Sequence, residues 1–124
     1  KHSVIALMPD QYGVKRGGTM RLGAYPCKVY GKQMKAAYGT DTISERHRHR
    51  FEFNNEYRRQ FEEAGMTLAG LSPDGTLCEA VEIDKNDFFV GGQFHPEFKS
   101  RPNNAHPLFR EFIRHAIGHM ERKA

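Results

Sequence analysis

The chain has 124 residues, of which 38% are hydrophobic and 27% are charged, and its mean hydropathy is −0.73. This composition fits one globular domain or a large piece of one. No apolar run approaches the roughly 20 residues that a membrane-spanning helix needs. The formal net charge of +4 is spread along the chain, which favours a solvated surface over one dedicated to a polyanion.

The start of the chain and its cysteines indicate the context of the protein. Lys1 and His2 lead into only a brief apolar stretch, with no initiator methionine and no signal-peptide pattern. We therefore expect an internal or truncated segment of a longer protein. Cys27 and Cys78 are too few for a disulfide framework, so we expect buried, inert thiols in a reducing, cytoplasmic setting.

The first third of the chain alternates apolar runs with turn-forming residues. Val4–Met8 is apolar, and the glycine-containing polar run 10–18 predicts a mobile loop. From Thr19 to Tyr30 the apolar spacing predicts a strand, which Pro26 interrupts with a bulge or places at a sheet edge. Gln33–Tyr38 predicts a short helix, which the glycine after it ends.

The middle of the chain combines a strand, a helix and a hairpin. Ile43–Phe53 alternates as a strand does, although its polar positions are long and basic. Asn55–Ala64 predicts a helix with an asparagine cap before it and a glycine stop after it. Thr67–Leu71 and Thr76–Ile83 predict the two strands of a hairpin, and Ser72–Gly75 carries the turn chemistry between them.

The last third ends in a helix. Phe88–Phe94 predicts an apolar strand, and a helix with a basic C-terminal end follows it. The stripe that we expect this helix to bury consists of Leu108, Phe109, Phe112, Ile113, Ala116 and Ile117. Strands and helices mix along the chain, so the residues predict a mixed α/β domain with two or three layers.

A histidine and a carboxylate stand two residues apart after the last predicted strand. Side chains at i and i+2 of an extended chain point to the same side, so His95 and Glu97 can face one another. Pro96 between them favours a position at the end of the strand. A carboxylate fixes the tautomer of its histidine, which can then take a proton from a thiol or hydroxyl. The same three residues also fit a plain solvated turn.

Residues 46–50 read Arg-His-Arg-His-Arg, the densest basic run of the chain. A guanidinium such as that of Arg50 can hold an α-carboxylate through two parallel hydrogen bonds. Judged without further context, the residues favour the other reading, in which Arg46, Arg48 and Arg50 form a solvated basic stripe on one face of a strand.

Two other kinds of site are open at this stage. His47 and His49 share a strand face and could belong to a metal site, but the flanking arginines oppose a bound cation. Phe51 and Phe53 beside basic residues also occur in nucleic-acid-binding modules. Three glutamates interrupt the positive track that a phosphate backbone requires: Glu45, Glu52 and Glu56.

Several blocks of the chain resemble the class I, triad-type glutamine amidotransferase family. Gly91–Phe98 resembles the signature that ends the amidotransferase domain. Further blocks resemble the branch of the family that aminates UTP to CTP: Gly17–Gly23, Ser44–Asn54, Ser72–Gly75, Lys99–Pro102 and His106–Phe109. The resemblance implies an α/β, flavodoxin-like mixed sheet with flanking helices, of which residues 1–124 would be the C-terminal part. Another class I member, such as GMP synthase, is the alternative enzyme, although the Arg-His-Arg-His-Arg block is unexpected there.

The resemblance implies roles for six residues. His95 would be the general base and acid, and Glu97 would orient it. Arg50 would bind glutamine, and Phe51 would line the same pocket. Thr19 and Arg21 would belong to a lid linked to allosteric activation by GTP.

The resemblance also implies a nucleophile and partners that this segment lacks. The family's cysteine lies on a Gly-x-Cys-x-Gly elbow, a pattern that neither Cys27 nor Cys78 matches. We therefore expect the isolated chain to be inactive without the N-terminal half of the amidotransferase domain and a synthase domain. The parent enzyme would use ATP, Mg²⁺ and UTP and would form a homotetramer. No cofactor, metal, nucleic-acid or membrane site is expected within the segment.

Overall fold

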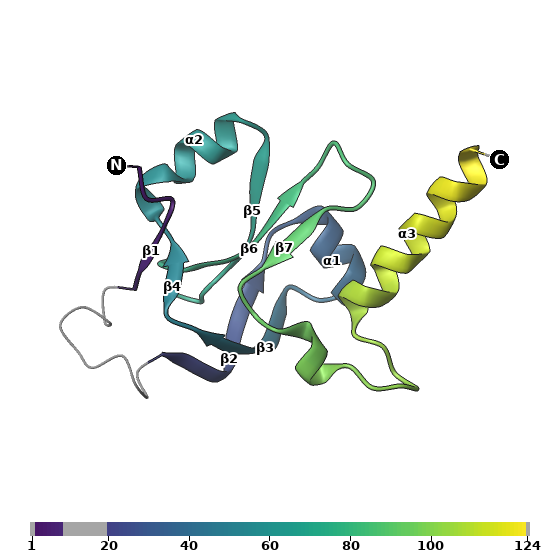
Figure 1. The fold of residues 1–124 in the computed structure, drawn as a ribbon, viewed down its shortest axis with the longest axis horizontal. Coiled ribbons are helices and arrows are strands. Elements are labelled where there is room, and N and C mark those ends of the chain that lie inside the picture. The colour runs from purple at the N-terminus through teal and green to yellow at the C-terminus, as the bar shows by residue number, and fades with distance from the viewer. Residues whose placement is uncertain (1, 9–19, 124) are drawn as a thin grey trace.

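A computed structural model describes residues 2–8 and 20–123, whose strands form two sheets (Figure 1). The predicted loop over residues 10–18 lies outside the described residues. The strands are β1 (Ile5–Leu7), β2 (Arg21–Val29), β3 (Thr42–His49), β4 (Phe51–Phe53), β5 (Met66–Leu71), β6 (Cys78–Ile83) and β7 (Val90–Gly92). The helices are α1 (Lys32–Tyr38), α2 (Arg58–Glu63) and α3 (Pro107–Lys123), with 3₁₀ turns η2 (Asn55–Tyr57) and η3 (Pro96–Lys99).

The larger sheet has the strand order β3-β2-β5-β6-β7, and the smaller sheet pairs β1 with β4. Every one of these pairings is antiparallel. The two termini lie at opposite ends of the molecule, and α3 projects beyond the sheets at the C-terminal end (Figure 1). No helix among the described residues is long and apolar enough to cross a membrane.

Strand β2 confirms the prediction around Pro26. Pairing with β3 runs without a bulge from Arg21 to Lys28, and Pro26 itself lies opposite Ser44. On its other side, β2 pairs with β5 only through Lys28 and Val29. Pro26 therefore lies where β2 is a sheet edge, the position at which a missing N–H is tolerated.

The expected strand over residues 43–53 is two strands in different sheets. β3 ends at His49 and β4 begins at Phe51, with a bend at Arg50 between them. The carbonyl of Arg50 accepts a hydrogen bond from the backbone N–H of Met8 at 3.0 Å. This tertiary contact explains why a continuous alternating pattern is broken.

The predicted helix over 55–64 and the hairpin after it are confirmed with small changes. The helical segment begins as η2, where the side chain of Asn54 accepts from the N–H of Glu56, and continues as α2. Gly65 follows with a φ of 102°, a conformation that favours glycine. Strands β5 and β6 then pair through the turn at 72–75.

Helix α1 agrees with the prediction, and its N-terminus has an unexpected partner. Gly39 ends the helix in the left-handed conformation with a φ of 71°. At the other end, the buried carboxylate of Glu82 accepts from the N–H groups of Gln33 and Met34 at 3.0 and 2.9 Å. A carboxylate at this end also favours the helix dipole, which accounts for a glutamate buried in β6.

The main core lies between the larger sheet and the helices, and its members include Cys27, Val29, Met34, Ala69 and Phe94. A second cluster forms around Phe53, Leu68 and Cys78. The apolar run 88–94 is mostly not a strand, because only Val90–Gly92 pairs with β6. Phe94 is buried beyond the end of β7 and anchors the segment that follows.

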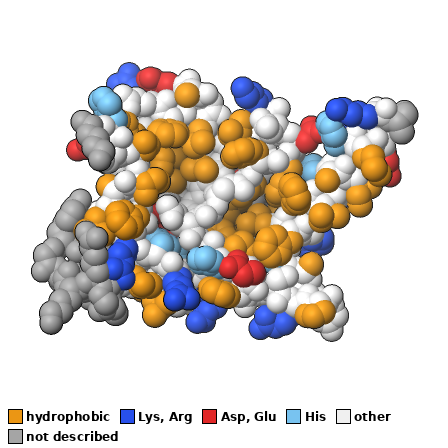
Figure 2. Space-filling model, viewed as in Figure 1, with side chains coloured by type: hydrophobic (Ala, Val, Ile, Leu, Met, Phe, Trp, Pro, Cys, Tyr) orange, Lys and Arg blue, Asp and Glu red, His pale blue; other side chains and the backbone are white. Residues whose placement is uncertain are grey.

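The prediction that α3 buries its apolar stripe is wrong for most of that stripe. Leu108 is buried, but Phe109, Phe112, Ile113 and Ile117 are 42 to 56% exposed. Figure 2 shows hydrophobic side chains gathered along this helix. Among the described residues, the helix is covered mainly at its N-terminal end, so periodicity identified an amphipathic helix but not what lies against it.

Candidate active site

His95 and Glu97 meet directly in the structure. The Nδ1 atom of His95 is 2.7 Å from the Oε1 atom of Glu97. The contact does not arise from the extended geometry expected from the sequence, because Pro96 begins η3 and Glu97 lies within this 3₁₀ turn. The tightness of the turn brings the two side chains together instead.

The pair is arranged for proton transfer at the outer nitrogen of the ring. A carboxylate only accepts, so Nδ1 carries the hydrogen and Nε2 is the free acceptor of a neutral imidazole. The backbone N–H of Glu97 and the His95 ring lower the pKa of the Glu97 carboxyl, which therefore remains ionised. The His95 side chain is 40% exposed, and its ring centre stacks on that of Phe98 at 5.2 Å, so part of the ring is accessible to a partner group.

A second histidine–glutamate pair is buried and its histidine is fully hydrogen-bonded, in contrast to the exposed pair of His95 and Glu97. The Nε2 atom of His106 is 2.6 Å from Glu45 Oε1, and both side chains are at most 2% exposed. The N–H of Leu108 donates to Nδ1 of the same ring, and the Tyr38 hydroxyl donates to Glu45. Every nitrogen of this imidazole is occupied, so His106 holds the start of α3 and is unsuited to general base catalysis.

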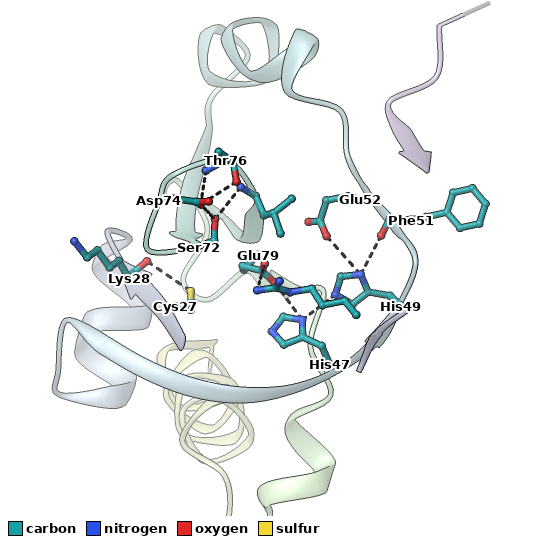
Figure 3. Close-up of polar contacts among 12 residues, drawn as sticks. Cys27, Lys28, His47, His49, Phe51, Glu52, Ser72, Asp74, Thr76 and Glu79 are labelled. Carbon is teal, nitrogen blue, oxygen red and sulfur yellow. Dashed lines mark hydrogen bonds and ion pairs between the residues drawn. The ribbon is translucent and has the colours of Figure 1, made fainter. Parts of the chain in front are cut away.

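A buried polar network, which consists of Arg21, His47, His49, Glu52 and Glu79, lies where the two sheets meet (Figure 3). Glu79 Oε1 is 3.2 Å from Arg21 Nη2, and Glu79 Oε2 is 3.2 Å from His47 Nδ1. The sequence did not identify Glu79 or Glu52 as members, because each stands singly among apolar residues. Within the predicted strands, neither residue stands at a position that the alternation alone marks as buried and polar.

Burial controls the protonation of this network. It lowers the pKa of His47 to about 3 and also lowers that of His49, so both rings are neutral. It raises the pKa of Glu52 to about 8, with a further contribution from the charge of Glu79, whose own pKa is also raised by burial. Arg21 contacts the carboxylate of Glu79, whereas Glu52 has no hydrogen-bond partner among the described residues and retains a proton near neutral pH.

The same network contains the candidate metal ligands of the described residues. His47, His49 and Glu79 place one donor atom each within 4.8 Å of one another. However, the facing ring nitrogens of the histidines are 2.8 Å apart, which is the spacing of a hydrogen bond, and Arg21 contacts the same carboxylate. We interpret the cluster as a hydrogen-bonded network rather than a metal centre.

The arginines of the basic run have different surroundings. Arg46 and Arg48 are exposed, on the face of β3 opposite His47, and this fits the solvated stripe. Arg50 is partly buried at the bend before β4, and Phe51 beside it is 46% exposed. The three arginines therefore do not form one continuous face.

Of the two residues expected in a regulatory lid, Thr19 lies outside the described residues. Arg21 begins β2, and its guanidinium lies 3.9 Å above the centre of the Tyr25 ring while it contacts Glu79. The structure therefore directs Arg21 into the buried network.

Both cysteines are buried, as expected. Burial raises the pKa of Cys27 to about 12 and that of Cys78 to about 11. Thiols with such pKa values carry almost no thiolate at neutral pH and are poor nucleophiles.

Comparisons with known proteins identify the family of the chain. The model of the family described as glutamine amidotransferase class-I matches residues 5–115. The CTP synthase of Roseiflexus sp. (strain RS-1) is 60% identical over 114 residues, which cover 90% of this chain and 20% of that protein. The CTP synthase of Rubrobacter xylanophilus is 55% identical over 121 residues, which cover 97% of this chain and 22% of that protein. The chain thus spans about a fifth of the length of these relatives.

A solved structure gives the same result for the fold. It is described as the Trypanosoma brucei CTPS glutaminase domain with bound acivicin, and it matches with a TM-score of 0.85 at 33% identity. The match covers 94% of this chain and 47% of that one. The expected fold and the narrower resemblance to CTP synthases are confirmed, and the alternatives are not favoured. With residues 5–115 matched and the fold shared, the chain belongs to the class-I glutamine amidotransferase family.

Proposed function

We propose that this chain contributes the histidine and glutamate of a Cys-His-Glu triad that hydrolyses glutamine in a CTP synthase. The observation that carries the proposal is the 2.7 Å contact between His95 Nδ1 and Glu97 on a ring that is 40% exposed. The released ammonia would serve the ATP-dependent amination of UTP to CTP. The similarity to CTP synthases along nearly the whole chain supports this substrate.

The role of His95 follows from its tautomer. A cysteine thiol from outside these residues gives its proton to His95 Nε2, and the sulfur attacks the carboxamide carbon of glutamine. The imidazolium then protonates the departing nitrogen, which leaves as ammonia and forms a γ-glutamyl thioester. Next, His95 takes a proton from water, whose oxygen attacks the thioester; glutamate leaves and the thiol is restored. Glu97 stabilises the charged imidazole in both steps.

Arg50 and Phe51 are the proposed glutamine-binding residues. The N–H of His95 is fixed to the carbonyl of Arg46 on β3, four residues before Arg50 at the bend that follows this strand. At the rise of a strand these positions are about 13 Å apart. An arginine side chain and an extended glutamine together span such a distance, so a guanidinium at Arg50 can hold the α-carboxylate while the carboxamide reaches His95.

The remaining parts of the enzyme would lie outside this segment. We propose that residues 1–124 are the C-terminal portion of an amidotransferase domain, whose other portion carries the cysteine. The exposed stripe of α3 supports a further layer of protein on this side. ATP, Mg²⁺ and UTP would bind the synthase domain, GTP would act through the region around Thr19 and Arg21, and the whole would be a cytoplasmic homotetramer.

A chimaera tests the proposal. This chain replaces the 114 matching residues of the Roseiflexus CTP synthase, and CTP formation is measured with glutamine and, separately, with ammonia. Ammonia bypasses glutamine hydrolysis, so it reports whether the rest of the enzyme is intact. We expect activity with both nitrogen sources. Activity with ammonia but none with glutamine would contradict the proposal.

A further inference from the structure

His49 connects the buried network to the bend that carries Arg50 and Phe51. Its Nδ1 atom is 3.1 Å from the carbonyl oxygen of Phe51, and its Nε2 atom is 2.8 Å from His47 Nδ1. Only 11% of the His49 side chain is exposed. The ring therefore spans the bend from β3 to β4 on its inner side (Figure 3).

The partners of His49 fix the direction of each hydrogen bond. A backbone carbonyl only accepts, so His49 Nδ1 donates to Phe51 and Nε2 of the neutral ring must accept. His47 Nδ1 then carries the hydrogen that it donates to His49. Glu79 Oε2 lies 3.2 Å from the same nitrogen without accepting a hydrogen bond from it, and both side chains are fully buried. His47 Nε2, the remaining acceptor, has no partner among the described residues.

Neutral rings are a condition for this relay, because a second hydrogen on His49 would set two donors against each other. Burial lowers the pKa of both histidines, which meets the condition at neutral pH. The charged groups around the rings are Glu79, which Arg21 contacts, and Glu52, whose Oε2 is 3.5 Å from His49 Nδ1. Burial also raises the pKa of Glu52. Because a protonated carboxyl competes poorly as an acceptor, His49 Nδ1 donates to the carbonyl oxygen of Phe51 instead.

We propose that His49 is a positioning residue for the glutamine-binding Arg50 and Phe51, held by a directional hydrogen-bond relay that runs from His47 through His49 to the carbonyl of Phe51. The positioning role rests on the proposed glutaminase function, whereas the relay itself does not. In this arrangement Arg21, which the family resemblance assigns to the lid, contacts the carboxylate of Glu79 that lies beside His47. The substrate-binding bend and the first residue of β2 thus share one buried anchor.

Nitrogen-15 NMR of the 124-residue chain tests the relay. The expected result is an Nδ1–H tautomer for both His47 and His49. His106 is the internal control, since Leu108 donates to its Nδ1 and Glu45 accepts from its Nε2. It should show the Nε2–H tautomer in the same spectrum. An Nε2–H tautomer at either His47 or His49 would overturn the relay.

Two substitutions in the chimaera test the positioning role. His49→Asn places an amide N–H near the position of Nδ1 and can still donate to Phe51, whereas His49→Gln places its amide near Nε2 and cannot. We expect His49→Gln to raise the KM for glutamine about tenfold, as for one lost hydrogen bond, with kcat at saturating glutamine little changed. His49→Asn should remain within about threefold of the unsubstituted chimaera.

The outcomes separate the proposals. Activity with ammonia should be the same in all three chimaeras, which shows that the synthase reaction is intact. Equal glutamine KM values for the unsubstituted, Asn and Gln forms would overturn the positioning role. Loss of glutamine-dependent activity already in the unsubstituted chimaera would contradict the proposed function and remove the positioning role with it, while the tautomers would still decide the relay.

Discussion

The backbone N–H of His95 donates to the carbonyl of Arg46 across 2.9 Å. This bond attaches the segment with the proposed base to the strand that leads to the proposed substrate-binding residues. The relative positions of the two are therefore set by backbone geometry and not by flexible side chains. A glutaminase site needs this rigidity because the carboxamide must lie within reach of Nε2 while the α-carboxylate is held elsewhere.

Arg50→Lys should weaken glutamine binding in the chimaera. A lysine retains the charge but makes no bidentate contact with a carboxylate, so we expect the glutamine KM to rise about tenfold or more. Steady-state kinetics with varied glutamine measure the change. Arg48→Lys is the matched control, because Arg48 belongs to the same run but is exposed on β3. Equal KM values for the two variants would remove Arg50 from the site.

Glu52 should make the chain less stable as the pH rises. Its folded pKa of about 8 lies above the ordinary value of 4.5, so the protonated carboxyl is the form that folding favours. The contribution of Glu52 to the free energy of unfolding should be fully present below pH 4.5 and should be lost as the pH rises towards 8.

The Glu52→Gln variant checks this expectation, because its amide cannot ionise. Urea unfolding at several pH values should show a weaker decline for the variant and an advantage over the wild type near pH 8. Since one pKa unit corresponds to about 1.4 kcal/mol, the shift from 4.5 to about 8 sets an upper limit of roughly 5 kcal/mol on this difference. Parallel curves for the two proteins would show that Glu52 ionises freely in the folded state.

Asp74 should stabilise the turn between β5 and β6 only while it is ionised. Its carboxylate accepts from the hydroxyl of Ser72 at 2.6 Å and from the N–H and hydroxyl of Thr76 at 3.1 and 2.8 Å (Figure 3). These bonds lower the pKa of Asp74 to about 2, so the stabilisation is present above the ordinary value of 3.8 and is lost as the pH falls towards 2. Asp74→Asn should lower the melting temperature at pH 7 but not at pH 2, and an equal loss at both would exclude an ionic contribution.

The two cysteines should be unreactive in the folded chain. Their raised pKa values and burial predict no labelling by a thiol reagent at pH 8 without denaturant and two labels per chain in urea. The isolated chain should also lack glutaminase activity. Rapid labelling of native protein, or measurable glutamine hydrolysis by it, would show that one of these thiols can act as a nucleophile.

Local signals in the sequence identified most of the elements. Gly39 and Gly65 marked the ends of helices because their backbones have positive φ values, and the turn at Ser72–Gly75 joined the predicted hairpin. The split at Arg50 was missed, since its causes are contacts with Met8 and His49 rather than a breaker residue. The cap of α1 was missed for a similar reason, as Glu82 lies 49 residues from Gln33.

For the candidate site too, local signals could be read from the sequence and long-range contacts could not. The motif alone brought His95 and Glu97 together, although by a 3₁₀ turn and not by an extended chain. Glu79 could not be recognised from sequence, because a single glutamate in an apolar strand does not reveal which side chains surround it. The exposure of Phe112 and Ile117 on α3 also could not be predicted from hydrophobic periodicity. Periodicity shows that a helix has an apolar face but not which elements pack against that face.

The most direct test of the central claim is the rate of glutamine-dependent CTP formation in chimaeras that carry His95→Asn or Glu97→Gln. His119→Asn is the control, because His119 is also half exposed and lies 3.4 Å from a carboxylate, that of Asp87. The account predicts a loss of at least about 100-fold for His95→Asn and a smaller loss for Glu97→Gln, with ammonia-dependent activity intact and His119→Asn unaffected. Full glutamine-dependent activity of the His95→Asn chimaera would contradict it.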